Sequence, residues 1–333
     1  MYKEFSTTKL LCVNIDMKKI DFLIESIMSK KSPLVVGLDP IWEKIPQFYK
    51  EMYNATDTLD NAGDVIFNFN KDIIDAVYNL VPAVKPQIAY YEAYGLPGLL
   101  AFDRTVKYAK SKNLLVIEDG KRNDISSTAE AYAKGHLGES QLINRKSPIF
   151  DVDFLTVTPF LGSDSITPFF NVCQQYDKGI FILVKTSNPS SWEIQNAKNS
   201  DGKFVYEMLA EYINNAGQNF VGNYGYSSIG AVVGATHPTE ARQIRQLLTN
   251  NFFLVPGYGM QGGTVTDILN CFNEDGLGAL INSSRGILYS HLNMFDNNCI
   301  SHTQYIGCII NSVNKANNEI YTTLRSNYPN MIY

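Results

Sequence analysis

The sequence has little of what builds metal sites or disulfide frameworks. Its 333 residues include only five cysteines and no Cys-x-x-Cys pair. They are Cys12, Cys173, Cys271, Cys299 and Cys308. This odd and scattered set fits neither a zinc site nor a disulfide framework. We therefore expect reduced, structural thiols in a cytoplasmic protein.

Histidine is also scarce, with four residues in the chain, and none stands in a metal-binding or Ser/His/Asp pattern. His237 alone follows a predicted strand, and its place before Pro238 at a helix start explains it adequately. The residue pattern therefore predicts no metal site.

Long apolar runs and an excess of positive charge are missing as well. No stretch approaches the ~20 apolar residues that a membrane helix needs, and the first residues lack the apolar core of a signal peptide. Lys and Arg number 28 against 33 Asp and Glu, a net charge of -5. This balance gives no basic surface for nucleic acid. We predict no membrane and no nucleic-acid partner, and we favour a small-molecule ligand.

Eight short apolar runs are present, and each is followed by polar or glycine-rich residues and then by a helical pattern. They occupy residues 34–38, 83–88, 114–117, 154–157, 180–184, 229–233, 252–255 and 279–281. Runs that are apolar on both faces are typical of parallel strands covered by helices. Eight such units predict an α/β fold, a single (β/α)8 TIM barrel over residues 1–333.

Two segments stand outside this repeating pattern. An N-terminal extension over residues 1–33 contains an amphipathic helix at 18–30, which we expect to pack at the bottom of the barrel. Residues 187–203 are long, polar and follow the fifth strand, where barrel enzymes carry mobile lids. A lid is our expectation for that loop, and a disordered surface loop is the alternative.

Charged residues interrupt the third apolar run at the point where the strand should end. The sequence IEDGKRND places Asp119, Lys121 and Asp124 there, and Lys85 and Gln87 follow the second run. Side chains two residues apart on a strand point the same way, so Asp119 and Lys121 should face one cavity. A Lys-Asp-Lys-Asp array of these residues would give every charge an opposite neighbour. A purely structural ion pair is the alternative.

The last two strands are followed by segments suited to an anion. VPGYGMQGGT supplies glycines that let backbone amides approach a phosphate, and a helix start follows it. NSSRG then brings Arg285, whose planar guanidinium matches phosphate geometry. Barrels often bind phosphate after strands seven and eight. Glycine-rich turns beside a surface arginine are the alternative interpretation.

Together, eight motifs resemble the orotidine 5′-monophosphate decarboxylase family, in its longer branch with KPQ and NSSRG signatures. They are GLDP at 37–40, KPQIAYYEAYG at 85–95, DGKRNDI at 119–125, TVTPFLGSDS at 156–165, VKTSNP at 184–189, VVGATHP at 232–238, VPGYGMQGG at 255–263 and NSSRG at 282–286. The resemblance implies decarboxylation of orotidine 5′-monophosphate to uridine 5′-monophosphate (UMP), the last step of de novo UMP synthesis, without a cofactor.

The resemblance also implies roles for individual residues. Lys121 would protonate carbon 6, Asp119 would sit beside the departing carboxylate, and Lys85 would hold Asp119 and the ribose. Asp124 would complete the catalytic set. The expected substrate-binding residues are Asp39, Gln87, Ile125, Thr128, Ser187, Pro256, Gln261, Ser284 and Arg285. In this family the segment matching Asp124, Ile125 and Thr128 reaches into the neighbouring subunit's site, so a homodimer is implied.

Three other functions are compatible with parts of this sequence pattern. Mg²⁺-dependent sugar-phosphate decarboxylases and aldol synthases of the same superfamily share the Asp-x-Lys-x-x-Asp signature. They would need a further acidic ligand, and Glu118 should point outward. A Schiff-base aldolase would use Lys185, which should alternate away from the cavity. A catalytically inactive nucleotide-binding module would be expected to have lost the charged array, which is retained here.

Overall fold

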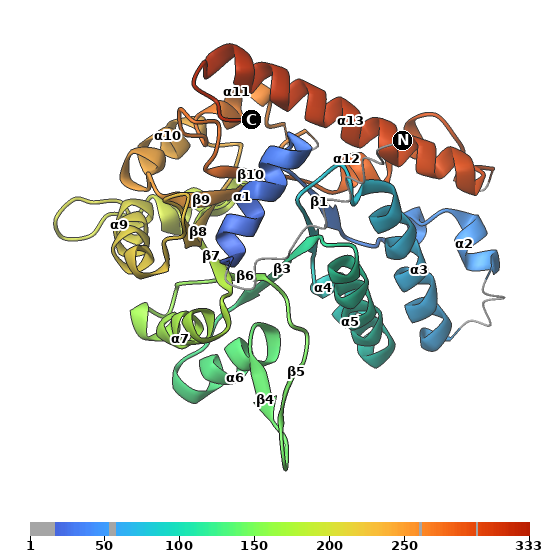
Figure 1. Cartoon of the computed structure of the whole chain (residues 1–333), viewed down its shortest axis with the longest axis horizontal. Helices are drawn as coiled ribbons and strands as arrows, with labels where there is room; N and C mark the ends of the chain where they lie inside the picture. The colour runs from blue at the N-terminus through green and yellow to red at the C-terminus, as the bar shows by residue number, and fades with distance from the viewer. Residues whose placement is uncertain (1–16, 53–57, 260–261, 298) are drawn as a thin grey trace, which may run out of the picture.

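The computed structural model describes residues 17–52, 58–259, 262–297 and 299–333. Eight parallel strands close into a barrel in the order β1-β10-β9-β8-β7-β6-β3-β2 (Figure 1). The strands are β1 (Leu34–Leu38), β2 (Ala83–Pro86), β3 (Leu115–Arg122), β6 (Phe154–Val157), β7 (Gly179–Lys185), β8 (Ser227–Val233), β9 (Asn251–Val255) and β10 (Ala279–Ser283). The predicted (β/α)8 barrel is confirmed, and each predicted apolar run forms one of these strands.

Helices surround the barrel between successive strands. They are α1 (Lys19–Lys30), α2 (Gln47–Met52), α3 (Leu59–Val77), α4 (Ala89–Glu92), α5 (Gly95–Ser111), α6 (Ser126–His136), α7 (Thr167–Tyr176), α8 (Trp192–Gln195), α9 (Val205–Gly217), α10 (Pro238–Leu247), α11 (Val265–Leu269), α12 (Arg285–Leu288) and α13 (His302–Asn327). Strands β1, β8 and β9 are buried along their whole length, because side chains of one face fill the barrel and those of the other pack under helices. No helix in the described part of the chain is long and apolar enough to cross a membrane.

Helix α1 lies across the N-terminal ends of the strands, as expected (Figure 1). Its polar side chains bond to segments that enter the barrel: Lys18 Nζ donates to Val221 O at 2.7 Å, and Lys30 Nζ donates to Val81 O at 2.8 Å. The Asp21 carboxylate, which is buried, accepts from the backbone N–H groups of Asn223 and Tyr224 at 3.0 and 3.3 Å. Buried Leu23, Ile24 and Ile27 face the barrel. The helix therefore closes the bottom and leaves the opposite end open.

A short hairpin between α6 and β6 was not predicted. Strands β4 (Glu139–Gln141) and β5 (Lys146–Pro148) pair in antiparallel fashion and project from the barrel wall (Figure 1). Both strands are short and polar, so they lack the apolar alternation that marks a strand in sequence.

We expect the Asp21→Ala variant to be less stable by about 1–3 kcal/mol, because two backbone N–H groups before β8 lose a charged acceptor. Urea unfolding followed by circular dichroism measures the change in midpoint. Glu25→Ala, on the same helix, is the control, since Glu25 makes only an exposed 3.3 Å bond with Tyr224. Equal midpoints for the two variants would contradict the role of Asp21 in holding α1 against the barrel.

Candidate active site

The C-terminal ends of the strands surround a cavity of about 640 Å³, here named the rim cavity. Its volume lies within the range of roughly 300–1,000 Å³ typical of small-molecule sites. Many residues singled out from the sequence share its wall: Asp39, Lys85, Gln87, Asp119, Lys121, Ser187, Pro256, Ser284 and Arg285. Residues that are more than 240 positions apart in the sequence therefore meet at one end of the barrel.

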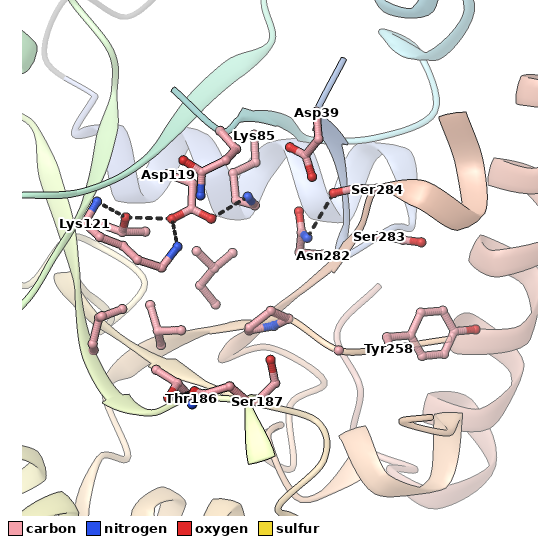
Figure 2. Close-up of a pocket in the computed structure, with 18 of the residues that line it drawn as sticks. Asp39, Lys85, Asp119, Lys121, Thr186, Ser187, Tyr258, Asn282, Ser283 and Ser284 are labelled. Carbon is pink, nitrogen blue, oxygen red and sulfur yellow. Dashed lines mark hydrogen bonds and ion pairs between the residues drawn. The ribbon is translucent and has the colours of Figure 1, made fainter. Parts of the chain in front are cut away.

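Asp119 lies between two lysines in the rim cavity (Figure 2). Lys85 Nζ, from β2, donates to Asp119 Oδ2 at 2.8 Å, and Lys121 Nζ donates to Asp119 Oδ1 at 2.5 Å. The Lys85 and Asp119 side chains are 5% and 15% exposed, whereas Lys121 is 45% exposed. Thus Lys85 and Asp119 form a buried ion pair. The Lys121 side chain extends from this pair into the open part of the cavity.

The protonation states of the buried pair follow from these contacts. Burial alone raises the pKa of Asp119, but the ammonium groups of Lys85 and Lys121 outweigh burial and hold it well below its usual range. Burial lowers the pKa of Lys85, yet Asp119 and then Asp39 outweigh that effect and leave the pKa raised. Asp119 is therefore a carboxylate and Lys85 an ammonium at neutral pH.

Strand β3 bulges where it presents these groups. Its pairing with β6 shifts between Glu118, opposite Leu155, and Arg122, opposite Val157. Lys121 adopts a φ of 45°, in the left-handed region that costs an L-residue about 1–2 kcal/mol. Gly120 lets the strand pass close to two side chains, because a Cβ would lie 2.9 Å from Glu118 Oε1 and 3.0 Å from Leu155 Cδ1. Asp119 and Lys121 share the cavity because of this bulge rather than through regular strand alternation.

The other charges of the segment face away from the cavity. Glu118 is fully buried and its Oε2 lies 2.8 Å from His136 Nδ1 on α6. Arg122 donates to Glu92 Oε1 at 2.9 Å and lies over the Tyr132 ring. The cluster that looked continuous in sequence is thus divided between the two faces of β3.

The end of β1 supplies a carboxylate with free acceptor capacity. Asp39 Oδ1 is buried and has no hydrogen-bond partner, and neither has Asn282 Oδ1 on the adjacent strand β10. The Asp39 backbone is held by Tyr289, whose hydroxyl donates to Asp39 O at 2.7 Å and accepts from Ile41 N at 2.6 Å. Because buried polar groups are normally paired, these two oxygens are suited to accept hydrogen bonds from ligand hydroxyls.

Ser284 and Arg285 lie at the opposite part of the cavity wall from Lys121 (Figure 2 shows Ser284). Gly37 allows Ser284 to pack closely against β1, since a Cβ there would be 1.7 Å from Ser284 Oγ. Arg285 opens α12. These residues form the candidate anion end of the cavity.

The helix after the glycine-rich loop differs from the sequence expectation of open N–H groups. Thr264 and Asp267 form a reciprocal cap at the start of α11, in which Asp267 Oδ2 accepts from Thr264 N at 2.8 Å. Thr264 Oγ1 in turn accepts from Asp267 N at 3.3 Å. Because its own carboxylate occupies this helix start, the helix is a poor anion site. Among the described residues of the loop, Pro256, Gly257 and Tyr258 reach the cavity wall.

Of four further predicted site residues, three lie away from the wall of the rim cavity and one is outside the described residues. Asp124, Ile125 and Thr128 lie at the start of α6, where Asp124 Oδ1 accepts from Ile125 N at 2.8 Å and Ile125 is 49% exposed. The fourth, Gln261, lies outside the described residues. Within one chain the charged array is therefore Lys85, Asp119 and Lys121, and Asp124 is not part of the cavity wall.

The loop over residues 187–203 is tied to the end of β7. It contains a 3₁₀ turn (Pro189–Ser191) and α8. Gln195 Oε1 accepts from Thr186 N at 2.9 Å, and Gln195 Nε2 donates to Thr186 Oγ1 at 2.8 Å. Lys185 points away from the rim cavity and donates to Asn196 Oδ1 at 2.6 Å. This position does not suit the Schiff-base function considered for Lys185.

Sequence reasoning missed several polar residues on the cavity wall. They are Tyr90, Thr156, Thr186, Asn188, Gln195 and Asn282. Thr156 carried a usable signal, because it is a hydroxyl residue inside an otherwise apolar strand. Gln195 carried none, since its approach to the cavity depends on how the loop folds back onto Thr186.

The described residues contain no group of three or more His, Cys, Asp or Glu side chains arranged to hold a metal ion. Glu118, the extra acidic ligand that the Mg²⁺-dependent alternative would need, faces α6 instead of the cavity.

Comparison with known proteins agrees with the motifs. A profile of the Orotidine 5'-phosphate decarboxylase / HUMPS family matches residues 32–293. The chain is 45% identical over 275 residues to the orotidine 5'-phosphate decarboxylase of Caldicellulosiruptor saccharolyticus, covering 82% of this chain and 90% of that protein. It is 42% identical over 307 residues to that of Clostridium tetani, covering 92% and 99%.

Solved structures are similar as well. The OMP decarboxylase of Leishmania donovani superimposes with a TM-score of 0.68 at 27% identity, covering 93% of this chain and 99% of that one. The family resemblance inferred from the motifs is confirmed: the chain belongs to the orotidine 5′-phosphate decarboxylase / HUMPS family.

Proposed function

We propose that this chain is a carboxy-lyase that converts orotidine 5′-monophosphate to UMP, without a cofactor. The observation that carries this proposal is the Lys85–Asp119–Lys121 array on the wall of the rim cavity, in a chain 45% identical to an orotidine 5′-phosphate decarboxylase. The array provides a fixed negative charge and a proton donor side by side, which is what a decarboxylation through a carbanion requires.

The substrate spans the cavity from the anion end to the charged array. Ser284 and Arg285 bind the phosphate, together with Gln261. Asp39 and Lys85 bind the ribose hydroxyls. The Asp39 oxygen that has no hydrogen-bond partner supports this assignment, because it can accept a bond from a hydroxyl. Ser187 recognises the edge of the pyrimidine. Gln87 and Pro256, which also line the cavity, complete the binding surface.

The chemical step breaks the bond between carbon 6 and the carboxylate. The carboxylate leaves as CO₂, and the electron pair of that bond remains on carbon 6. The Lys121 ammonium then transfers one proton to carbon 6, forming the C–H bond of UMP. Lys121 suits this role because its amine is close to Asp119 and still 45% exposed to the cavity. A preorganised cation beside the developing carbanion lowers the barrier without solvent reorganisation.

Asp119 contributes through its permanent charge. Burial raises the pKa of Asp119, but the two ammonium groups outweigh burial and hold the pKa far below its usual range. Asp119 therefore stays ionised and cannot relieve its repulsion with the substrate carboxylate by taking up a proton. That repulsion is released when CO₂ leaves. Binding of the distant phosphate supplies the free energy that brings the two carboxylates together, and closure of the 187–203 loop excludes water.

The active form is a homodimer in which Asp124, Ile125 and Thr128 complete the neighbouring site. Their position supports this part of the proposal: they sit at the start of α6, directly after the catalytic strand, and Ile125 is 49% exposed. An Asp124 contributed by the partner would give Lys121 a second carboxylate and extend the array to Lys-Asp-Lys-Asp.

We expect Lys121→Ala to reduce kcat for orotidine 5′-monophosphate by at least about 100-fold, the usual contribution of a positioned general acid. The assay follows pyrimidine absorbance in the presence of a chelator. Lys107→Ala, which removes a 67% exposed lysine on α5, is the control and should retain wild-type activity. Full activity of Lys121→Ala would refute the assigned proton donor, and activity that disappears with chelator would favour the Mg²⁺-dependent alternative.

Mixing the inactive Lys121→Ala and Asp124→Ala proteins should restore activity if Asp124 serves the partner's site. Random subunit exchange makes half of the dimers mixed, each with one intact site, so about a quarter of wild-type activity is expected. Mass spectrometry verifies that exchange has occurred. If exchange is complete and no activity returns, Asp124 acts within its own barrel or not at all.

The pH dependence of kcat should show no inflection on the acid side from Asp119, because its folded pKa lies below the reference value of about 3.9. In contrast, kcat/KM should fall below about pH 6, where a phosphate monoester takes up its second proton. Steady-state kinetics between roughly pH 4.5 and 8 separate the two profiles. A decline in kcat with a midpoint in this window would contradict a permanently ionised Asp119.

A further inference from the structure

The strand ladder is interrupted at the centre of the active site. Because β3 pairs with β6 through Glu118–Leu155 and then through Arg122–Val157, three residues of β3 face the single residue Thr156 of β6. An insertion of this kind is a β-bulge, and backbone groups inside it lose their partners in the ladder. The residues concerned are Asp119, Gly120 and Lys121.

The side chain of Thr156 supplies a partner for one backbone group of the bulge and also bonds to the Asp119 carboxylate. Lys121 N donates to Thr156 Oγ1 at 2.9 Å, and Thr156 Oγ1 donates to Asp119 Oδ1 at 3.0 Å. A hydroxyl carries one proton and two lone pairs, so it can make both bonds at once. Thr156 is 1% exposed, which leaves little access for water to make these bonds in its place.

The outer side of the bulge is fixed by packing. Gly120 lies so close to Leu155 and the Glu118 carboxylate that a Cβ would be 3.0 and 2.9 Å from them, and these side chains would have to shift. Lys121 is held with a φ of 45°, which an L-residue rarely adopts. On the inner side, the Lys121 backbone N–H bonds to the buried Thr156 hydroxyl.

We propose that Thr156 is a positioning residue for decarboxylation: its hydroxyl ties the Asp119 carboxylate to the Lys121 backbone and so holds the proton donor in line with carbon 6. The inference rests on the function proposed above. A hydroxyl is needed because the two bonds require an acceptor and a donor on one atom. Without them Lys121 can still reach the cavity, but its amine is no longer held at one distance from the reacting carbon.

The matched variants are Thr156→Val, which keeps the shape and removes the hydroxyl, and Thr156→Ser, which keeps the hydroxyl. We expect Thr156→Val to lower kcat by roughly 10–100-fold, the loss associated with a misplacement of about 1 Å. KM and the Kd for UMP should stay within about twofold of wild type, since binding groups are untouched. Thr156→Ser should retain most of kcat.

Thr158→Val serves as the control on the same segment. Thr158 Oγ1 contacts Lys121 O at only 3.4 Å, so its removal should leave kcat unchanged. A double variant extends the test. Because Thr156 acts through Lys121, adding Thr156→Val to Lys121→Ala should cause little further loss of kcat.

Three results would overturn the inference. The first is a Thr156→Val protein with wild-type kcat, and the second is a Thr156→Ser protein as impaired as Thr156→Val. The third is a loss of kcat that only matches a loss of folded sites, which titration with UMP counts. Thr156→Ala replaces Thr156→Val if the latter does not fold, with the same expectation. If the wild-type protein fails to turn over orotidine 5′-monophosphate, the proposed function itself fails.

Discussion

The sharing of one buried carboxylate by two lysines is the constraint on which the active site depends. Asp119 accepts from Lys85, Lys121 and Thr156, and it keeps its charge because the two cations outweigh the cost of burial. Removing Lys85 would leave Asp119 with Lys121, a 45% exposed lysine, as its one cationic partner among these three, and a buried charge that loses its buried partner is costly in a low-dielectric interior. The two cations also prepare the cavity for a substrate that brings further negative charge.

Barrel geometry explains how the set is assembled. Lys85 and Asp119 come from β2 and β3, which are neighbours in the closed sheet, and Thr156 comes from β6 on the other side of β3. Parallel strands bring all their C-terminal ends to one rim. Helix α1 covers the opposite end, so the polar residues that accumulate at the rim face a single open cavity. Helix α1 therefore packs against one end of the barrel, and the residues proposed for the reaction lie at the other end.

The bulge in β3 separates two kinds of charge that are adjacent in sequence. Asp119 and Lys121 enter the cavity, whereas Glu118 bonds to His136 on α6 and Arg122 bonds to Glu92 after β2. The outward pairs connect the strand to its neighbouring helices. We infer that they help to keep the bulge in place while the inward groups carry the reaction.

The sequence by itself determined the barrel, its strands and most residues of the rim cavity, because apolar runs report burial on both faces and parallel strands must end at one rim. It also indicated the family through eight ordered motifs. The tertiary structure decided what depends on distant contacts: the bulge at Gly120, the contact of Thr156 with Asp119, the return of Gln195 to Thr186 and the β4–β5 hairpin. Such contacts join residues that are brought together in space by packing, so no local sequence pattern predicts them.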